Sequence, residues 1–299
     1  MTQKLTPATA ALLVVPPLLW AGNAVVGRLV HELVPPITLN LLRWVLAFFI
    51  LLPLAWPIFR RGSGLYTHWK RFAMLGLLGV GLYNALQYLA LQSSTPINVT
   101  LVAASMPVWM LLVGRLFFRN PVNMRQWLGA LLSILGVLLV LSRGQWQQLL
   151  ALRLVAGDIY MLLATLCWSF YSWLLARGGD PADIKRHWAH FLLAQVTFGV
   201  MWSAACTGGE WLLTDAHITF SPVLLAALAY VSVGPAVIAF RCWGAGVGRV
   251  GPNIAAFFSN LTPLFAAVMS ATVLGELPHL YHAVAFALIV SGIVLSARR

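Results

Sequence analysis

Charged side chains are scarce in this sequence, and acidic ones are the scarcest. Only 9% of the 299 residues are charged, and Asp and Glu together number 7. A soluble domain is about a quarter charged and about half apolar. This chain is 61% hydrophobic with a mean hydropathy of +0.86. It is therefore predicted to be a membrane protein that crosses the bilayer several times.

Cysteine is rare as well, and the three cysteines exclude a disulfide framework. Cys167 lies within an apolar run. Cys206 and Cys242 stand at opposite ends of one predicted span, about 30 Å apart, so they cannot meet. Residues 1–9 carry one lysine and lead straight into an apolar run, so we expect no cleavable signal peptide.

The spacings that carry catalysis or cofactor binding are missing too. The sequence contains no HExxH or HxxxH pair for a metal, no GxxxxGK[ST] loop for a nucleotide, and no evident Ser/His or paired-carboxylate constellation. We therefore expect no metal, no cofactor, no enzymatic activity and no direct drive by ATP.

The net charge of +12 has two interpretations. A basic chain can bind nucleic acid, but such proteins gather their charges on one soluble face. Here the charges lie in short segments between apolar runs, which is typical of membrane topology. We expect a lipid bilayer as partner and no nucleic acid.

Apolar runs of about 20 residues, the length needed to cross a bilayer, predict an all-α membrane protein with ten transmembrane helices. Prolines punctuate most connections, where a first helical turn tolerates them. The predicted spans are 8–31, 36–59, 69–92, 95–118, 124–142, 155–177, 188–207, 221–243, 250–273 and 278–297.

Lysine and arginine lie mostly on one side of this arrangement. With the N-terminus in the cytoplasm, 15 of the 19 basic residues fall in cytoplasmic segments, and only Arg28, Arg143 and Arg153 fall outside. This bias predicts a multi-pass protein of the cell inner (plasma) membrane with both termini cytoplasmic.

A segment of the second half repeats the layout of one in the first half. Residues 252–276 align without a gap with residues 96–120, which lie 156 positions earlier. Pro263 then falls on Pro107. Two prolines at one fixed distance indicate an internal repeat.

The repeat extends over both halves. Trp20 and Trp168 begin similar motifs 148 residues apart, so residues 1–143 and 154–299 are predicted to be two five-helix repeats. Because five is odd, the second repeat enters the membrane from the opposite side. The predicted fold is two inverted five-helix repeats around a central cavity, a design typical of transporters.

In this order and spacing the motifs resemble the EamA family of the drug/metabolite transporter superfamily. The resemblance implies a ten-helix carrier of two inverted repeats, shaped as a basket around a central cavity, and many members export amino acids or metabolites. Within the family the chain is most similar to the aromatic amino acid exporters. Asn120 departs from the pattern, because the first repeat usually has a glutamate there. The matching positions are Trp20 to Asn23, Arg43, Tyr88 to Ser94, Pro107, Gly129, Gly136, Gly157, Asp158, Trp168 to Arg177, Pro263, 274–276 and Gly292.

A stripe of polar and aromatic side chains runs along the predicted span 69–92. Tyr83 and Gln87 are one helical turn apart, and so are Asn84 and Tyr88. Lipid cannot satisfy their polar groups, so the stripe faces a cavity or another helix. We favour the cavity because four such groups cluster.

Three tryptophans are candidates for contact with a substrate. Trp20 and Trp168 are equivalent in the two repeats, and Trp109 follows Pro107 by two residues. Aromatic faces stack on a substrate ring or attract an ammonium group. Ordinary helix packing is the alternative.

The two proline-containing spans provide further candidates, Asn98, Ser259 and Asn260. Pro107 and Pro263 each remove a backbone N–H and free a carbonyl one turn earlier. These prolines act either as hinges or as static kinks.

Few charged groups lie near the predicted spans. Arg43 could hold a substrate carboxylate, but we favour a structural role for it. Asp158 is expected to cap a helix. Glu276 is a gate residue or simply faces water, and His187 and His190 are expected at the membrane surface.

These features predict a secondary transporter that exports amino acids, aromatic and other neutral ones, by alternating access through the central cavity. The alternative is a carrier of another metabolite, such as a nucleotide sugar or a nucleoside, although a phosphate calls for paired basic residues. We expect a monomer and, with no carboxylate at the span centres, facilitated diffusion. The predicted hinges are Pro107 and Pro263, and the predicted substrate-binding residues are Trp20, Asn23, Tyr83, Gln87, Tyr88, Asn98, Trp109, Trp168, Tyr171, Ser259 and Asn260.

Overall fold

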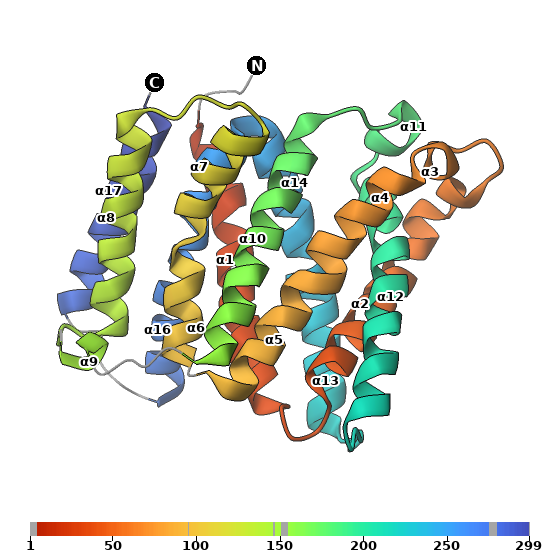
Figure 1. Ribbon diagram of the computed structural model, residues 1–299, viewed down its shortest axis with the longest axis horizontal. Coiled ribbons are helices and arrows are strands. Elements are labelled where there is room, and N and C mark those ends of the chain that lie inside the picture. The colour runs from red at the N-terminus through yellow and green to blue at the C-terminus, as the bar shows by residue number, and fades with distance from the viewer. Residues whose placement is uncertain (1–4, 95, 146, 151–154, 275–279, 299) are drawn as a thin grey trace.

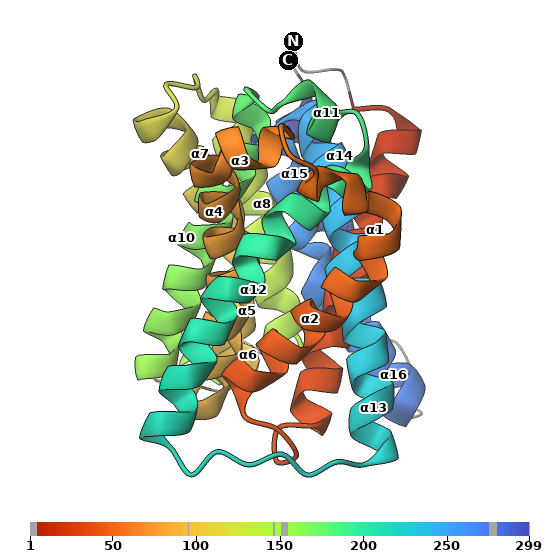
Figure 2. The same cartoon turned by 90° about the vertical axis from the view of Figure 1, so that its right-hand side faces the viewer.

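The protein is a bundle of helices that run roughly along one common direction (Figure 1). The computed structural model describes residues 5–94, 96–145, 147–150, 155–274 and 280–298, and it contains no strand in these ranges. Both termini lie at the same end of the bundle, together with the short helix α11 (Figures 1 and 2).

Most of the chain is helical. The short elements are α3 (Gly64–Thr67), α9 (Gln147–Leu150), α11 (Ala182–Lys185) and the 3-10 helix η1 (Trp56–Phe59). The longer helices are α1 (Pro7–Leu29), α2 (Pro36–Ala55), α4 (Trp69–Leu75), α5 (Tyr83–Ser93), α6 (Pro96–Ala104), α7 (Met106–Phe117), α8 (Met124–Leu141), α10 (Ala156–Arg177), α12 (Trp188–Leu213), α13 (Pro222–Val231), α14 (Ala239–Val250), α15 (Pro252–Ser259), α16 (Leu261–Leu274) and α17 (Leu280–Ala297).

Helix starts follow the local sequence. Proline occupies the first turn of α1, α2, α13 and α15, where its missing N–H has no partner to lose. At the start of α8, the side chain of Asn123 accepts a hydrogen bond from the Gln126 N–H, and Gln126 accepts one from the Asn123 N–H. This reciprocal cap satisfies two end groups at once.

Nine helical stretches in the described ranges are long and apolar enough to cross a membrane. Eight of the predicted spans correspond to single stretches, and residues 250–273 correspond to α15 followed by α16. The predicted span 95–118 is divided into α6, of 9 residues, and α7, of 12 residues. The breaks fall at Ser105 and Asn260, two and three residues before Pro107 and Pro263.

Two helices contain a π-helical segment that the sequence did not predict. The segment η2 (Gly76–Leu82) separates α4 from α5, and η3 (Ser232–Ile238) separates α13 from α14. The two segments lie 156 residues apart, the same distance as the repeated prolines. Pro235 lacks the N–H that a regular helix needs. Gly76 lies so close to α12 that a Cβ would be 2.6 Å from the Gln195 carbonyl oxygen.

The helix pairs follow a regular pattern. Helix α5 packs against α10, and α14 packs against α1; α2 packs against α12, and α8 against α17. Helix α1 begins at the end where the termini lie, whereas α10 ends there, so these two helices run in opposite directions (Figure 1).

Small residues bring α8 and α17 into backbone contact. A Cβ at Gly292 would lie 2.6 Å from the Gly129 carbonyl oxygen, and a Cβ at Gly129 would lie 2.7 Å from the Gly292 carbonyl oxygen. A Cβ at Gly136 would likewise lie 2.9 Å from the Ala285 carbonyl oxygen. Close approach through small residues is the usual means of packing helices in membranes.

We predict that Gly292→Ala lowers the free energy of unfolding by about 1–3 kcal/mol, because the added methyl group must push α8 and α17 apart. The matched control is Gly244→Ala, since a Cβ at Gly244 meets nothing within 4 Å. Thermal unfolding of the detergent-solubilised variants measures the difference. Equal melting temperatures for the two variants would contradict the close contact.

Candidate functional site

A cavity of about 940 Å³ opens at the end of the bundle where the termini lie. Its walls come from α10, α12, α14 and α15, and its mouth includes Lys185, Arg241 and Arg298. Tyr171 and Phe240 lie among its innermost lining residues, and both are almost fully buried. The cavity therefore reaches from one end of the bundle into its aromatic interior.

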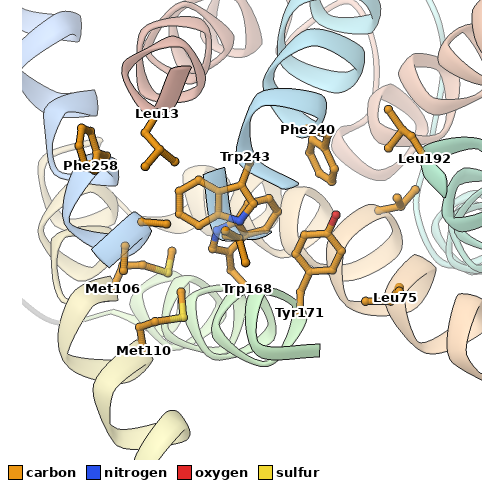
Figure 3. Packing of buried hydrophobic residues seen from close by; sticks show 14 of the residues in the cluster. Leu13, Leu75, Met106, Met110, Trp168, Tyr171, Leu192, Phe240, Trp243 and Phe258 are labelled. Carbon is orange, nitrogen blue, oxygen red and sulfur yellow. The ribbon is translucent and has the colours of Figure 1, made fainter. Parts of the chain in front are cut away.

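Trp168 is the centre of that interior. Its ring, 1% exposed, lies 4.7 Å from Tyr83, 4.9 Å from Tyr171 and 5.2 Å from Trp20, measured between centroids. Phe240 at 5.3 Å and Trp243 at 5.5 Å complete the set. Figure 3 shows Trp168 beside Trp243 and Tyr171, with Met106 and Met110 to one side. We call these six rings the aromatic cluster.

Hydrogen bonds hold individual rings of the aromatic cluster in place. The Tyr171 hydroxyl donates to Gln195 Oε1 at 2.9 Å, and Trp243 Nε1 donates to Ser172 Oγ at 3.0 Å. Trp20 Nε1 donates to the Pro235 carbonyl within η3 at 3.4 Å. Buried Tyr and Trp generally use their polar atoms in this way, and the rings of the cluster meet one another edge-to-face or tilted.

A buried polar group lies next to the aromatic cluster. Arg43 on α2 is fully buried, and its Nη1 donates to Asn84 Oδ1 at 3.0 Å, to the Tyr88 hydroxyl at 3.2 Å and to Asn23 Oδ1 at 3.3 Å. The Tyr88 hydroxyl donates to Asn23 Oδ1 at 3.1 Å. We call these four residues the Arg43 cluster. Asn23 follows Trp20 by one turn, so the Arg43 cluster lies farther from the termini than the aromatic cluster does.

At the end of the bundle opposite the termini, one carboxylate connects α12 to the start of α2. Glu210 near the end of α12 accepts hydrogen bonds from Ile37 N at 2.9 Å, Thr38 N at 2.8 Å and Thr38 Oγ1 at 2.6 Å. An anion at a helix N-terminus is stabilised by the free N–H groups and the helix dipole. Deeper along the same interface, Asn40 Nδ2 donates to Ser203 Oγ at 3.1 Å. A second pocket of about 900 Å³ opens at this end, and Ile37 and Glu210 of the contact are among its lining residues.

Several sequence-predicted site residues come together. Trp20, Tyr83, Trp168 and Tyr171 belong to the aromatic cluster, and Asn23 and Tyr88 belong to the Arg43 cluster. Gln87 is half-buried on α5, one turn after Tyr83.

Other predicted residues lie apart from these clusters. Trp109 Nε1 donates to Ser105 Oγ of its own segment at 3.0 Å, and Ser259 Oγ donates to the Ala256 carbonyl. Asn260 donates to Ser133 Oγ on α8 at 2.9 Å, which is a contact between helices. The Asn98 side chain and Glu276 lie outside the described residues.

Comparison with known proteins identifies the family. A sequence model of the EamA-like transporter family matches this chain twice, over residues 8–142 and 155–298. This chain belongs to that family.

Several relatives of this EamA-like chain carry the name of an uncharacterized transporter. An uncharacterized transporter of Archaeoglobus fulgidus is 27% identical over 97% of this chain and 98% of its own length. A protein of Salmonella typhimurium named a probable amino-acid metabolite efflux pump is 25% identical over 89% of this chain and 86% of its own length. A crystal structure at 21% identity superposes with a TM-score of 0.73 over 97% of this chain and 96% of that one, which shows the same fold.

The membership and the apolar helices together establish a multi-pass membrane protein of transporter type. The named relatives are transporters, and none of the described residues forms a group of three or more metal-binding side chains. Asp158 accepts from the Val155 N–H at 2.8 Å, as expected for a helix cap. His187 and His190 lie at the start of α12.

Sequence reasoning on this EamA-like chain missed Phe240 and Trp243. Adding the repeat distance of 156 to Asn84 and Gln87 gives these two positions, so the signal was present. The polar side chains that mark the stripe in the first half have apolar counterparts in the second half, at Phe240 and Trp243. The repeat distance therefore identifies the helix face that points to the centre of the bundle, even where polar residues of one half correspond to apolar residues of the other.

We predict that Glu210→Gln loosens the contact between α12 and the start of α2. The loss of the charged acceptor costs about 1.4 kcal/mol, or about tenfold in the open-to-closed ratio. In a chain with Cys167, Cys206 and Cys242 replaced by serine, Ser203→Cys introduces a buried thiol behind the contact. Its rate of labelling by a water-soluble maleimide reports the opening.

The matched control for Glu210→Gln is Asp215→Asn, which removes an exposed carboxylate at the same end of the bundle. We expect no change in labelling with it. Equal rates in both variants would show that Glu210 does not hold this end closed.

Proposed function

We propose that this protein is a secondary transporter that exports amino acids, aromatic and other neutral ones, by alternating access through its central cavity. The observation that carries the proposal is the cavity of about 940 Å³ that opens at one end and stops at the aromatic cluster. A transport pathway that is open to one side and closed to the other has this form.

The proposed halves are residues 1–143 and 154–299, inserted in opposite directions. Three observations support them. The family model matches once in each half. The segments η2 and η3 share the repeat distance of the prolines. The packing of α5 on α10 has its counterpart in α14 on α1, while α1 and α10 run in opposite directions (Figure 1).

The proposed location is the inner membrane with both termini in the cytoplasm, because basic residues concentrate at that end. In this orientation the large cavity faces the cytoplasm, and Glu210 closes the outer side. Pro107 and Pro263, next to the breaks between α6 and α7 and between α15 and α16, are the proposed hinges. A monomer contains both halves and therefore a whole pathway.

The proposed substrate class rests on the chemistry of the interior. The aromatic cluster offers ring faces to an apolar side chain or an ammonium group, and the Arg43 cluster offers neutral hydrogen-bonding groups beside one cation. The relative from Salmonella typhimurium carries the name of an amino-acid metabolite efflux pump. The proposed binding residues are Trp20, Asn23, Tyr83, Gln87, Tyr88, Trp168 and Tyr171.

The second candidate is a carrier of another metabolite, such as a nucleotide sugar or nucleoside. Lys185, Arg241 and Arg298 at the cavity mouth favour it, because phosphate groups need several cations. Lys185 and Arg298 lie at the mouth, and the Arg241 guanidinium stacks on Trp188 at the start of α12 rather than on the aromatic cluster, so we place the amino acid first.

We predict that Trp168→Ala and Gln87→Ala each reduce uptake of L-phenylalanine into reconstituted vesicles, Trp168→Ala by more than tenfold. Trp168 contacts five other rings, and an aromatic pair contributes about 0.5–1.5 kcal/mol. The matched control is Trp69→Ala, whose ring is half exposed at the bundle end. Unaltered transport in both interior variants would remove the proposed site.

We also predict that transport follows the substrate gradient alone, because no described carboxylate lies in the aromatic or Arg43 cluster. At fixed substrate, an imposed proton gradient is expected to leave the initial uptake rate unchanged. Vesicles with and without a protonophore provide the comparison. Accumulation that depends on the proton gradient would overturn facilitated diffusion.

A further inference from the structure

Arg43 carries a charge that no described side chain neutralises. It is fully buried, and its hydrogen bonds go to neutral oxygen atoms of Asn23, Asn84 and Tyr88. The Trp44 ring, with its centroid 5.1 Å from the guanidinium carbon, adds a cation–π contact but no negative charge. Ion pairs of arginine in the described ranges involve Arg71 with Asp180 instead. Burial of an unpaired ion is costly, and ionisable groups kept inside membrane segments mark ligand or ion pathways.

The same region contains donors without acceptors. Arg43 Nε, Arg43 Nη2, Asn84 Nδ2 and Trp168 Nε1 are buried and have no hydrogen-bond partner in the described part of the chain. Buried polar groups of native proteins are nearly always paired. A carboxylate accepts hydrogen bonds at both oxygens and donates none, and a guanidinium group binds it in a bidentate manner. The set therefore suits an anionic acceptor.

The position of Arg43 suits a molecule with an apolar body and an acidic end. Tyr83 packs on Trp168 with ring centroids 4.7 Å apart, and the next residue, Asn84, contacts Arg43. If the apolar part of a ligand packs among the rings of the aromatic cluster, its acidic end can lie one helical turn farther from the termini. Arg43 is at that position.

Positive charge along the entry route agrees with this direction of binding. Lys185, Arg241 and Arg298 line the cavity, and the one aspartate of its lining, Asp180, pairs with Arg71 and also, at 4.0 Å, with Lys185. A field of one sign at a cleft attracts oppositely charged ligands. The cytoplasmic bias of basic residues explains the mouth equally well, but it does not explain a cation in the middle of α2.

We infer that Arg43 binds the carboxylate of the transported molecule, with Asn84 and Trp168 as additional donors. The recognised class is then a free carboxylate on an apolar or aromatic body, whether or not an ammonium group is present. This inference replaces the structural role that the sequence favoured for Arg43. The inference rests on the proposed function only in saying that the bound molecule is transported. Binding of a carboxylate at Arg43 can be measured whether or not the protein is an amino acid exporter.

The test uses three probes that differ in one group each. L-Phenylalanine has both charges, 3-phenylpropanoate lacks the ammonium group, and L-phenylalanine amide lacks the carboxylate. Thermal-shift titrations of the full-length purified protein give an apparent affinity for each. We expect both carboxylates to bind about 10- to 100-fold more tightly than the amide, the range for hydrogen bonds to charged groups.

In Arg43→Gln we expect the preference for carboxylates to disappear, while affinity for the amide is kept and the melting temperature is unchanged or higher. Arg43→Lys keeps the charge and is expected to restore part of the preference. Arg115→Gln, a change of the same type at an exposed position on α7, is the matched control and should behave as the native protein.

Three outcomes would overturn the inference. The first is that the Arg43→Gln variant prefers the carboxylates over the amide as strongly as the native protein does. The second is an equal loss of all three probes with a lower melting temperature, which would make Arg43 structural. The third is failure of either carboxylate to stabilise the native protein at millimolar concentration. If carboxylates bind through Arg43 but vesicles transport no amino acid, the inference stands and the proposed function fails.

Discussion

Lipid offers no hydrogen-bonding partner, so each polar group in the middle of this bundle must find one within the protein. This constraint explains why irregular backbone is confined to places where other helices cover it. The π segment η2 lies against α12, where Gly76 approaches the Gln195 carbonyl oxygen. The carbonyl of Pro235 in η3 receives the indole N–H of Trp20. Irregularity of this kind is tolerated only beside a cavity or a packed neighbour, which is where both segments lie.

The same constraint separates the interior into two chemically different levels. In the aromatic cluster Trp20, Tyr171 and Trp243 each make one hydrogen bond at the ring edge, whereas Trp168 Nε1 has no partner in the described ranges. The rings pack on one another edge-to-face or tilted. The Arg43 cluster concentrates amide, phenol and guanidinium groups one turn farther along α1 and α5. A molecule that passes from the cavity would meet apolar surface first and polar groups second. Amphipathic metabolites have the matching division.

Much of this arrangement could be predicted from the sequence, since span lengths, connecting prolines and the 156-residue distance all reflect local rules. The breaks at Ser105 and Asn260 follow from the prolines beside them. The π segments could not be predicted, because they depend on how closely another helix approaches. Trp109 and Asn260 matched the chemistry of a site, yet Trp109 Nε1 bonds within its own segment and Asn260 Nδ2 bonds to α8. The buried Oδ1 of Asn260 has no partner in the described part of the chain. Phe240 and Trp243 were missed because their apolar side chains carry no signal of their own. The burial of Arg43 without a counterion in the described ranges could not be predicted, because it is visible only in three dimensions.

The matched pair of π segments has a geometric consequence. A π turn accommodates one residue more than an α turn, and one residue of an α-helix corresponds to about 100° of rotation. If η2 relaxed to regular α geometry, the whole of α5 would turn by that angle about its own axis, and Tyr83 and Asn84 would exchange places with their neighbours on the helix surface. The corresponding change in η3 would reorient Phe240 and Trp243 on α14. Each half thus contains a π segment that ends one or two residues before the side chains that face the centre.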